Sequence, residues 1–357
     1  MTSRIMNANV LVTASGGIVA QGIIKCLKLA NKQKKSGTKY KIFATDINAK
    51  APGLYRSDMG ILVPPVTAAN YHKVIIKTCI EQKIKAIFIG SDEELLPLTM
   101  AKREIEDKTG ATVIANPTET IVNSGDKWKT FKFLKENGLP YADSSLLQDQ
   151  EKFIKKYKFP IVIKPREGHG SLHFYLVHNN KELDNAANAI RNAGWRPLLQ
   201  EYLQGDDTEF TTGVTVSQDG KVMSSISINK FLKSGQTYKA FIDNYKVVRQ
   251  SAEQAALKIG ARGAINIQAK MAKGKPKIFE INARFSATSP LRAVAGINEP
   301  DIVFRNMVLD EQISVKEYKK LVCLRYWNEV YIPYLTYKKV EHDKKVQRST
   351  TFIPDYF

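Results

Sequence analysis

The segment FEINARFSATSP, which begins at Phe279, contains side chains that could take part in phosphate or metal chemistry. If it forms a strand, Glu280, Asn282 and Arg284 project from one face, because successive side chains of a strand alternate between its two faces. We expect the apolar residues Phe279 and Ile281 to lie on the other face and to pack in the core. Solvent-facing strands usually carry Lys, Glu and Thr in any order, so we favour a functional site over a polar flank here.

A second strand with one polar face, AINIQAK, directly precedes this segment, and the turn KGKP would join the two into a hairpin. With the turn centred in KGKP, Gln268 lies opposite Ile281, and one β-bulge would bring it beside Glu280 or Asn282. Carboxylate and amide oxygens suit Mg²⁺, which is usually shared with substrate phosphates. The sequence therefore predicts a metal site at Gln268, Glu280 and Asn282, with Arg284 placed to meet a transferring phosphoryl group.

A glycine-containing loop, in IVIKPREGHGS, follows another buried strand. Lys164 ends that strand, and the loop contains Gly168, Gly170 and Ser171. Such a loop exposes backbone N–H groups that can bind phosphate oxygens, with a lysine beside them to neutralise charge. It does not match the Walker A pattern. A lysine that ends a strand at the surface explains the pattern equally well, so both interpretations remain open at this point.

The linker LLQEYLQGDDTEF contains Glu201 and Leu203 at a strand end and Glu209 after a turn. The backbone of such a linker can recognise a nucleotide base, and a carboxylate can accept hydrogen bonds from both ribose hydroxyls. An ordinary acidic turn is an equally good interpretation of these residues alone.

The N-terminal segment SGGIVAQG lies between a predicted strand and a predicted helix, where a dinucleotide-binding fold has its phosphate loop. Gly16, Gly17 and Gly22 do not have the G-x-G-x-x-G spacing. Asp46, at the end of the second strand, could imitate the acid that binds ribose. We favour a tight turn with close helix–strand packing over nicotinamide binding.

The elements that must position these residues fall into two groups. Up to about residue 118, apolar strands alternate with amphipathic helices, which predicts a parallel sheet covered on both faces, a Rossmann-like domain. The predicted strands are 9–15, 40–46, 86–90 and 112–116, and the predicted helices are 18–30, 71–82 and 93–108. After a well-delimited helix within 124–140, strands joined by tight turns predict an antiparallel α+β region.

The composition excludes several classes of protein. The chain has 357 residues, 43% of them hydrophobic and 25% charged, which is typical of a globular rather than a disordered protein. No apolar run reaches the length of a membrane span, and we expect no signal peptide. Three widely spaced cysteines argue against a structural zinc site and for a reducing compartment, so we predict a cytoplasmic protein.

The net charge of +19 has two interpretations. It could indicate a nucleic-acid-binding protein, or a lysine-rich surface that attracts anionic ligands such as nucleotides. The lysines occur in short groups spread along the chain, without interleaved aromatic residues. We therefore favour small anionic ligands over nucleic acid.

Taken in order, these segments resemble the ATP-grasp superfamily, in particular the branch that includes the carbamoyl-phosphate synthetase large subunit and the pyrrolysine-biosynthesis ligase. EINARFSATSPLRAVAG is the most specific part of the similarity, and ATDINAKAPGLYRSD and FLKSGQTYKAF support it. The resemblance implies three domains: a Rossmann-like pre-ATP-grasp domain at 1–118, a lid subdomain at 119–198, and a C-terminal subdomain with metal-binding strands at 199–357.

The resemblance also implies a role for each matching residue. Gln268, Glu280 and Asn282 would bind Mg²⁺ (or Mn²⁺), and Arg284 together with Lys164 would act on the γ-phosphate. The implied ATP-binding residues are Lys127, Lys164, Gly168, Gly170, Ser171, Glu201, Tyr202, Leu203 and Glu209.

The activity implied by the resemblance is that of an ATP-dependent carboxylate–amine ligase. A carboxylate would attack the γ-phosphate of Mg-ATP to form an acyl phosphate, and an amine would then displace phosphate to form an amide. The partners would be ATP and small carboxylate and amine substrates, and a homodimer is compatible with the resemblance. A nicotinamide-dependent reductase and a basic nucleic-acid-binding protein are kept as alternatives.

Overall fold

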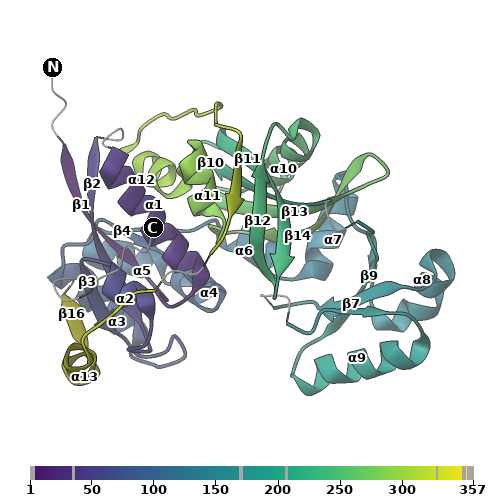
Figure 1. Cartoon of the computed structure of the whole chain (residues 1–357), viewed down its shortest axis with the longest axis horizontal. Helices are drawn as coiled ribbons and strands as arrows, with labels where there is room; N and C mark the ends of the chain where they lie inside the picture. The colour runs from purple at the N-terminus through teal and green to yellow at the C-terminus, as the bar shows by residue number, and fades with distance from the viewer. Residues whose placement is uncertain are drawn as a thin grey trace.

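The protein is built around three β-sheets, which follow one another across the molecule (Figure 1). We call them sheet A, on the left of Figure 1, sheet B, in the middle, and sheet C, on the right. The computed structural model describes residues 5–33, 37–168, 172–205, 208–326, 329–347 and 351.

Sheet A has the strand order β16-β3-β2-β1-β4-β5, and its first five strands in the chain pair in parallel. This confirms the predicted parallel sheet, with its alternating helices. The strands are β1 (Met6–Val12), β2 (Thr38–Asp46), β3 (Met59–Leu62), β4 (Ala86–Phe88) and β5 (Thr112–Ile114), and the helices are α1 (Ile18–Gln33), α2 (Pro52–Arg56), α3 (Tyr71–Glu81), α4 (Asp92–Met100) and α5 (Lys102–Thr109).

The helix predicted over 93–108 is two helices rather than one. Pro97 lies inside α4, where it supplies no backbone N–H for the helical ladder. The backbone of Ala101, at φ −84° and ψ 2°, then separates α4 from α5. The apolar periodicity continues through this break, which is why the sequence pattern alone suggested a single helix.

The sixth strand of sheet A comes from the end of the chain. β16 (Lys345–Gln347) follows α13 (Tyr334–Asp343) and pairs antiparallel with β3. Val346 packs in a small core with Leu54 and Tyr55. This part of the predicted region 199–357 therefore pairs with the first sheet, a contact between distant segments that no local pattern reveals. The domain boundaries themselves stay predictions.

Sheet B is antiparallel, with the order β14-β13-β10-β11-β12-β15. Its strands are β10 (Glu209–Val216), β11 (Val222–Lys233), β12 (Gln236–Ile242), β13 (Gly263–Ala272), β14 (Lys275–Asn282) and β15 (Leu321–Leu324), with α10 (Lys246–Lys258), α11 (Ser289–Ala295) and α12 (Glu299–Leu309) beside them. The predicted antiparallel region and its β13–β14 hairpin are confirmed.

Sheet C is a smaller antiparallel sheet with the order β6-β9-β7-β8. Its strands are β6 (Ser144–Ser145), β7 (Ile161–Pro165), β8 (Tyr175–Val177) and β9 (Pro197–Glu201), and its helices are the 3-10 helix Leu147–Asp149, α8 (Gln150–Tyr157) and α9 (Asn180–Asn192). Two further helices, α6 (Thr118–Ser124) and α7 (Lys127–Glu136), connect sheets A and C. Sheet C packs on α9 through its own core, which includes Ile163, Ile190 and Leu199.

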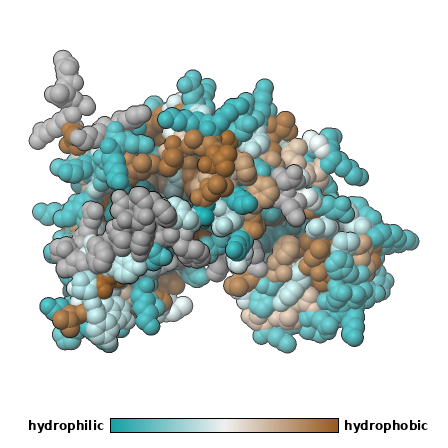
Figure 2. Space-filling model, in the orientation of Figure 1, coloured by the Kyte–Doolittle hydropathy of each residue, from teal (hydrophilic) through white to brown (hydrophobic). Residues whose placement is uncertain are grey.

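The face of the molecule shown in Figure 2 is mostly hydrophilic, with smaller apolar areas among the charged side chains. Among the described residues, no helix combines the length and the apolar composition needed to cross a membrane.

Candidate active site

A cavity of about 510 Å³ lies between sheets B and C. Nine of the thirteen site residues predicted from the sequence line it: Lys127, Lys164, Gly168, Tyr202, Glu209, Gln268, Glu280, Asn282 and Arg284. The cavity therefore brings together residues that are up to 157 positions apart in the chain, from Lys127 to Arg284.

The β13–β14 hairpin has the register that the sequence suggested. Gln268 pairs directly with Glu280, and a register shift follows between Gln268 and Ala269, which confirms the predicted bulge. The Gln268 Nε2 atom donates to Glu280 Oε2 at 3.0 Å, and Asn282 lines the same cavity. One carboxylate and two amide groups therefore meet at one wall of the cavity.

The bulge overturns the prediction for Phe279. Pairing passes from Gln268–Glu280 to Ala269–Ile278, so Phe279 has no partner in the ladder and the alternation of faces shifts by one residue. Ile278 and Ile281 are both buried, at 1% exposure each. Phe279 is half-buried and lines the cavity instead of packing in the core. The prediction was right for Ile281 and wrong for Phe279.

Lys164, at the end of β7, is a buried cation in the opposite wall. Its Nζ donates to Gln200 Oε1 at 2.9 Å and lies 5.3 Å from the centre of the Phe279 ring. Burial, together with the nearby charge of Lys127, lowers the pKa of Lys164 to about 7, although Glu280 acts in the opposite direction. A bound anion would favour the charged form of this lysine.

Lys127 is positioned by the start of α7. Asp126 caps this helix, since its carboxylate accepts from the backbone N–H of Trp128, and it also pairs with Arg166. The Lys127 Nζ donates to the backbone oxygen of Gly168 at 2.9 Å. A second lysine therefore lies where the glycine-containing loop begins.

Gly168 is a position that the local backbone restricts to glycine. Its φ is +130°, and a Cβ atom there would lie 1.6 Å from the ring of Trp195. The loop therefore begins with a close approach to an aromatic ring. Gly170 and Ser171, which were predicted to bind phosphate, lie outside the described residues.

Glu209 and Gln268 are joined by a lysine that the sequence analysis missed. The Lys230 Nζ lies 2.9 Å from Glu209 Oε1 and donates to Gln268 Oε1 at 2.6 Å. Lys230 is 7% exposed and lines the cavity. The signal in the sequence was a lysine within an otherwise buried strand, SSISINK, which requires a charged or hydrogen-bonded partner.

The Glu201 side chain holds two strands together instead of lining the cavity. Its carboxylate accepts from Lys277 Nζ at 2.6 and 2.7 Å and from the backbone N–H of Asp143 at 2.7 Å, so it links β9 to β14. The Leu203 backbone oxygen accepts from Lys270 Nζ at 3.3 Å. Neither Glu201 nor Leu203 is among the described residues that line the cavity, and the proposal that their backbone binds a base stays a prediction.

Arg284 binds an acid from the first part of the chain. Its Nε and Nη2 donate to the two carboxylate oxygens of Asp92 at 2.8 and 3.0 Å, and Nη2 also lies 3.3 Å from Asn282 Oδ1. Burial acts to lower the pKa of Arg284, but the Asp92 carboxylate outweighs it and the net shift is upward. No pattern in the sequence indicated this pair, because Asp92 lies directly before the predicted helix 93–108, where an acidic residue is common.

A larger cavity, of about 970 Å³, adjoins the first one. The two share Lys127, Gly168, Glu280 and Asn282, and the larger one extends along α4 and α7 to Trp195. The shared residues therefore lie at the boundary of the two cavities. The smaller cavity lies between sheets B and C, and the larger one extends to the Rossmann-like region.

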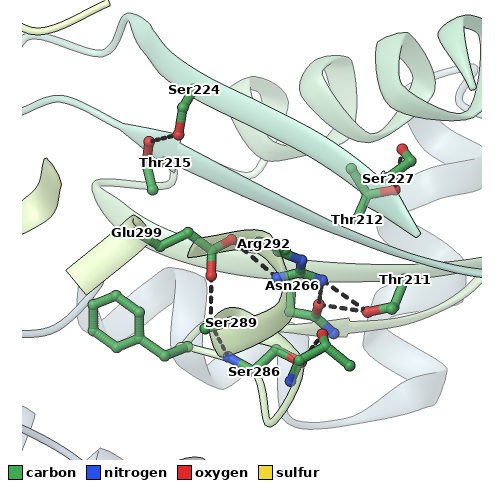
Figure 3. A network of polar contacts seen from close by, with 12 residues as sticks. Thr211, Thr212, Thr215, Ser224, Ser227, Asn266, Ser286, Ser289, Arg292 and Glu299 are labelled. Atoms are coloured by element: carbon green, nitrogen blue, oxygen red, sulfur yellow. Dashed lines mark hydrogen bonds and ion pairs between the residues drawn. The ribbon is translucent and has the colours of Figure 1, made fainter. Parts of the chain in front are cut away.

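Behind the hairpin, a polar network is sealed from solvent (Figure 3). Arg292 is 0% exposed; its Nη1 donates to Glu299 Oε1 at 2.9 Å and its Nη2 to Asn266 Oδ1 at 2.7 Å. Thr211 also donates to Asn266, at 2.7 Å. Gly213 is necessary for this packing, because a Cβ there would lie 1.7 Å from Glu299 Oε1.

Two known protein-family models match this chain, one for each of its two main parts. A model described as "ATP-grasp domain" matches residues 124–288, and one described as "PylC-like, N-terminal domain" matches residues 12–114. Residues 124–288 therefore match the ATP-grasp domain. The chain combines a PylC-like N-terminal domain with the ATP-grasp domain, in the order and branch that the sequence resemblance predicted.

The chain is similar to carbamoyl-phosphate synthases. It is 23% identical over 234 residues to the enzyme of Methanobrevibacter smithii, a match that covers 61% of this chain and 62% of that one. It is 20% identical over 204 residues to the arginine-specific large chain of Bacillus subtilis, covering 53% of this chain and 19% of the other. The matches thus span less than two thirds of the length of these relatives.

Solved structures share the fold over most of the chain. N5-carboxyaminoimidazole synthetase from Staphylococcus aureus, complexed with ADP, has a TM-score of 0.69 at 14% identity and covers 96% of this chain and 87% of its own. The L-amino acid ligase from Bacillus licheniformis has a TM-score of 0.63 at 18% identity and covers 85% of this chain and 74% of its own. The ATP-grasp fold predicted from the sequence is confirmed.

Proposed function

We propose that this protein is an ATP-dependent carboxylate–amine ligase that forms an amide through an acyl phosphate and releases ADP and phosphate. The observation that carries the proposal is the cavity between sheets B and C, where Lys127 and Lys164 line one side and Glu280, Asn282 and Gln268 the other. Cations for phosphate and oxygen ligands for a hard metal ion are the two requirements of a Mg-ATP site.

The donor set fits magnesium. Glu280 offers a carboxylate, and Asn282 and Gln268 offer amide oxygens, in a cavity that two lysines keep favourable for phosphate. Bound Mg²⁺ (or Mn²⁺) would neutralise the phosphate oxygens and hold them in position for transfer. Lys164 would be protonated when it binds the γ-phosphate, so that it neutralises phosphate charge. Arg284 would stabilise negative charge on the transferred phosphoryl group.

Part of the cavity lining would suit a flat base, because Phe174, Leu176, Leu232 and Phe279 supply apolar side chains to it. An adenine ring packed between such side chains would explain why Phe174 and Leu232 are 50% and 42% exposed here, since a ligand would cover them. Glu209 lies where a ribose could be held.

The acid and amine substrates would occupy the larger cavity. It adjoins the proposed phosphate position through Glu280 and Asn282, and its lining includes Lys129, which could neutralise a carboxylate. The protein's contribution would be mainly the positioning of reactants and the neutralisation of charge. A cytoplasmic location and a homodimer remain predictions.

The nicotinamide alternative is less well supported. Asp46, the residue that could imitate a ribose-binding acid, accepts from the backbone N–H of Gly16 at 2.7 Å and from that of Asn48 at 2.9 Å. It therefore joins the turn after β2 to the glycine-containing turn after β1, and the domain matched at residues 124–288 is an ATP-grasp domain.

The proposal is tested by incubating the protein with Mg-ATP and pools of amino acids and small carboxylic acids while ADP and phosphate release are measured. In the pool that elicits turnover, Glu280→Gln and Asn282→Ala should each lower the rate by about 100-fold or more, because charge stabilisation at the phosphates is lost. Glu136→Gln, an exposed acid on α7, serves as the matched control and should keep full activity.

Three results would contradict this function. They are turnover that persists in both variants, a protein that releases no ADP with any pool, and AMP as the product instead of ADP.

A further inference from the structure

We propose that Asp92 is a positioning residue for phosphoryl transfer, which holds the Arg284 guanidinium in place at the wall of the smaller cavity. The inference rests on the ligase function proposed above and names a further residue for it. Asp92 lies in the segment that matches the PylC-like N-terminal domain, residues 12–114, whereas Arg284 lies in the segment that matches the ATP-grasp domain, residues 124–288. The phosphate site of the second segment would therefore depend on a side chain from the first.

The contact between the two side chains has a geometry that fixes orientation. Arg284 Nε and Nη2 donate to the two carboxylate oxygens of Asp92, at 2.8 and 3.0 Å. Two parallel hydrogen bonds define the plane of a guanidinium, whereas a single one would leave it free to rotate. The Arg284 side chain is 13% exposed and the Asp92 side chain 32%, so the pair is largely enclosed but still reached by solvent.

Two further contacts of the guanidinium come from its own segment. Nη1 donates to the backbone oxygen of Phe285 at 3.0 Å, and Nη2 lies 3.3 Å from Asn282 Oδ1. Both of these acceptors are neutral, whereas Asp92 supplies a full negative charge. Without Asp92, Arg284 would lose the charged partner that orients its plane, and this change would occur beside Asn282, a proposed metal ligand.

Asp92 is itself held firmly, because it is the first residue of α4 and the start of this helix is tied to sheet A. The Ser91 hydroxyl caps the helix by accepting from the backbone N–H of Glu94 at 3.2 Å. The backbone N–H of Gly90 donates to Thr13 Oγ1 at 3.1 Å, and a Cβ atom at Gly90 would lie 2.0 Å from the Thr13 backbone oxygen. Such close packing leaves the strand-to-helix turn little room to move, so a carboxylate placed there can fix its partner.

The pair lies where the two cavities of the candidate active site meet. Asp92 lines the larger cavity, in which we placed the acid and amine substrates, and Arg284 lines the smaller one, in which we placed the nucleotide. Phosphoryl transfer depends mainly on position and charge, and a displacement of about 1 Å can lower a rate about 100-fold. Because solvent can reach the pair, its contribution to stability should be small. Loss of Asp92 should therefore affect catalysis much more than folding.

The test is steady-state kinetics of ADP release, with Mg-ATP and the substrate pool that elicits turnover. Asp92→Ala should lower kcat by about 10- to 100-fold and change the KM for ATP by about twofold at most, because Arg284 acts on the transferred group rather than on the bound nucleotide. The control, Glu104→Ala, removes an exposed carboxylate that also pairs with a cation, Lys108, and should keep full activity. Glu104 lines neither cavity of the candidate active site.

A double variant separates positioning from an independent structural role. Since Asp92 acts through Arg284, the kcat of Asp92→Ala combined with Arg284→Met should equal that of Arg284→Met alone, to within about twofold. Two independent effects would multiply instead. Thermal unfolding of the same samples shows whether each variant is folded, and Asp92→Asn, which keeps the shape of the side chain, replaces Asp92→Ala if the alanine variant unfolds.

The proposed role of Asp92 is overturned if Asp92→Ala keeps the kcat of the control, if its effect is confined to KM, or if the two losses multiply in the double variant. Any of these results with an active wild-type protein leaves the ligase function intact and removes only the role of Asp92. If no pool elicits ADP release from the wild-type protein, the ligase proposal fails, and the role of Asp92 fails with it.

Discussion

Asn266 and Gln268 lie on the same face of β13, because they are two residues apart in a strand, but their surroundings differ. At the inner end, Asn266 is 3% exposed and receives hydrogen bonds from Arg292 and Thr211. Two residues further along, Gln268 bonds to Lys230 and Glu280 at the wall of an open cavity. The inner amide completes a sealed network that needs no ligand, whereas the outer one lies where a ligand can reach it.

Arg284 and Arg292, which follow β14, show the same difference between a sealed and an accessible polar group. Arg292 pairs with Glu299 in complete burial (Figure 3). Arg284 pairs with Asp92 at the edge of the cavity, where the Asp92 side chain is 32% exposed. Residue type and spacing are therefore insufficient to separate a structural polar group from a ligand-binding one, and the degree of burial decides between them.

The largest expected effect comes from breaking the sealed pair. Arg292→Met leaves the Glu299 charge buried without a partner and should lower the free energy of unfolding by about 3–5 kcal/mol. Arg284→Met is the matched variant: solvent can reach Asp92, so the loss of stability should be about 1 kcal/mol or less. Urea unfolding of both proteins measures the difference. Equal losses would mean that burial does not distinguish the two pairs.

A smaller effect is expected from the two amides of β13. Asn266→Ala leaves Arg292 and Thr211 without an acceptor and should cost about 1–3 kcal/mol of stability. Gln268→Ala should instead lower ATP turnover by about tenfold or more, with little change in the unfolding midpoint, if Gln268 is a metal ligand. Thermal unfolding and ADP release, measured on the same samples, test this. The comparison fails if the two substitutions have the same profile.

The smallest effect concerns protons at Lys164. With a pKa of about 7, this lysine is largely neutral at pH 8 in the free protein, and a bound phosphate would restore its charge. Nucleotide binding should therefore take up about one proton at pH 8 and almost none at pH 6, where the lysine is already charged.

Calorimetric titration with nucleotide, in buffers of different ionisation enthalpy, measures this uptake at each pH. Lys164→Gln is the control and should remove the pH dependence. An uptake at pH 8 that persists in this variant would assign the proton to another group.

Much of the fold could be predicted because its signals are local. Alternating strands and helices predicted sheet A, and tight turns between strands predicted sheet B. The break at Ala101 and the pairing of β16 with β3 could not be predicted, since the first lies inside one continuous apolar period and the second joins segments almost 300 residues apart.

The candidate site was also predictable in part. Gln268, Glu280 and Asn282 share one short hairpin, so the strand period and a single bulge were enough to bring them together. Lys230 and Asp92 were missed because each enters from a distant element and looks like an ordinary strand or helix residue in its own segment.

By itself the sequence determined which side chains share a face, because alternation along a strand and the geometry of a hairpin are local properties of the backbone. The order and spacing of its segments also indicated the ATP-grasp domain that residues 124–288 match. Only the tertiary structure decided which of those polar faces are sealed and which are open. Burial depends on the elements that pack from elsewhere in the chain, and the bulge at Phe279, which turned a core residue into a cavity wall, shows how one shifted pairing reassigns a side chain.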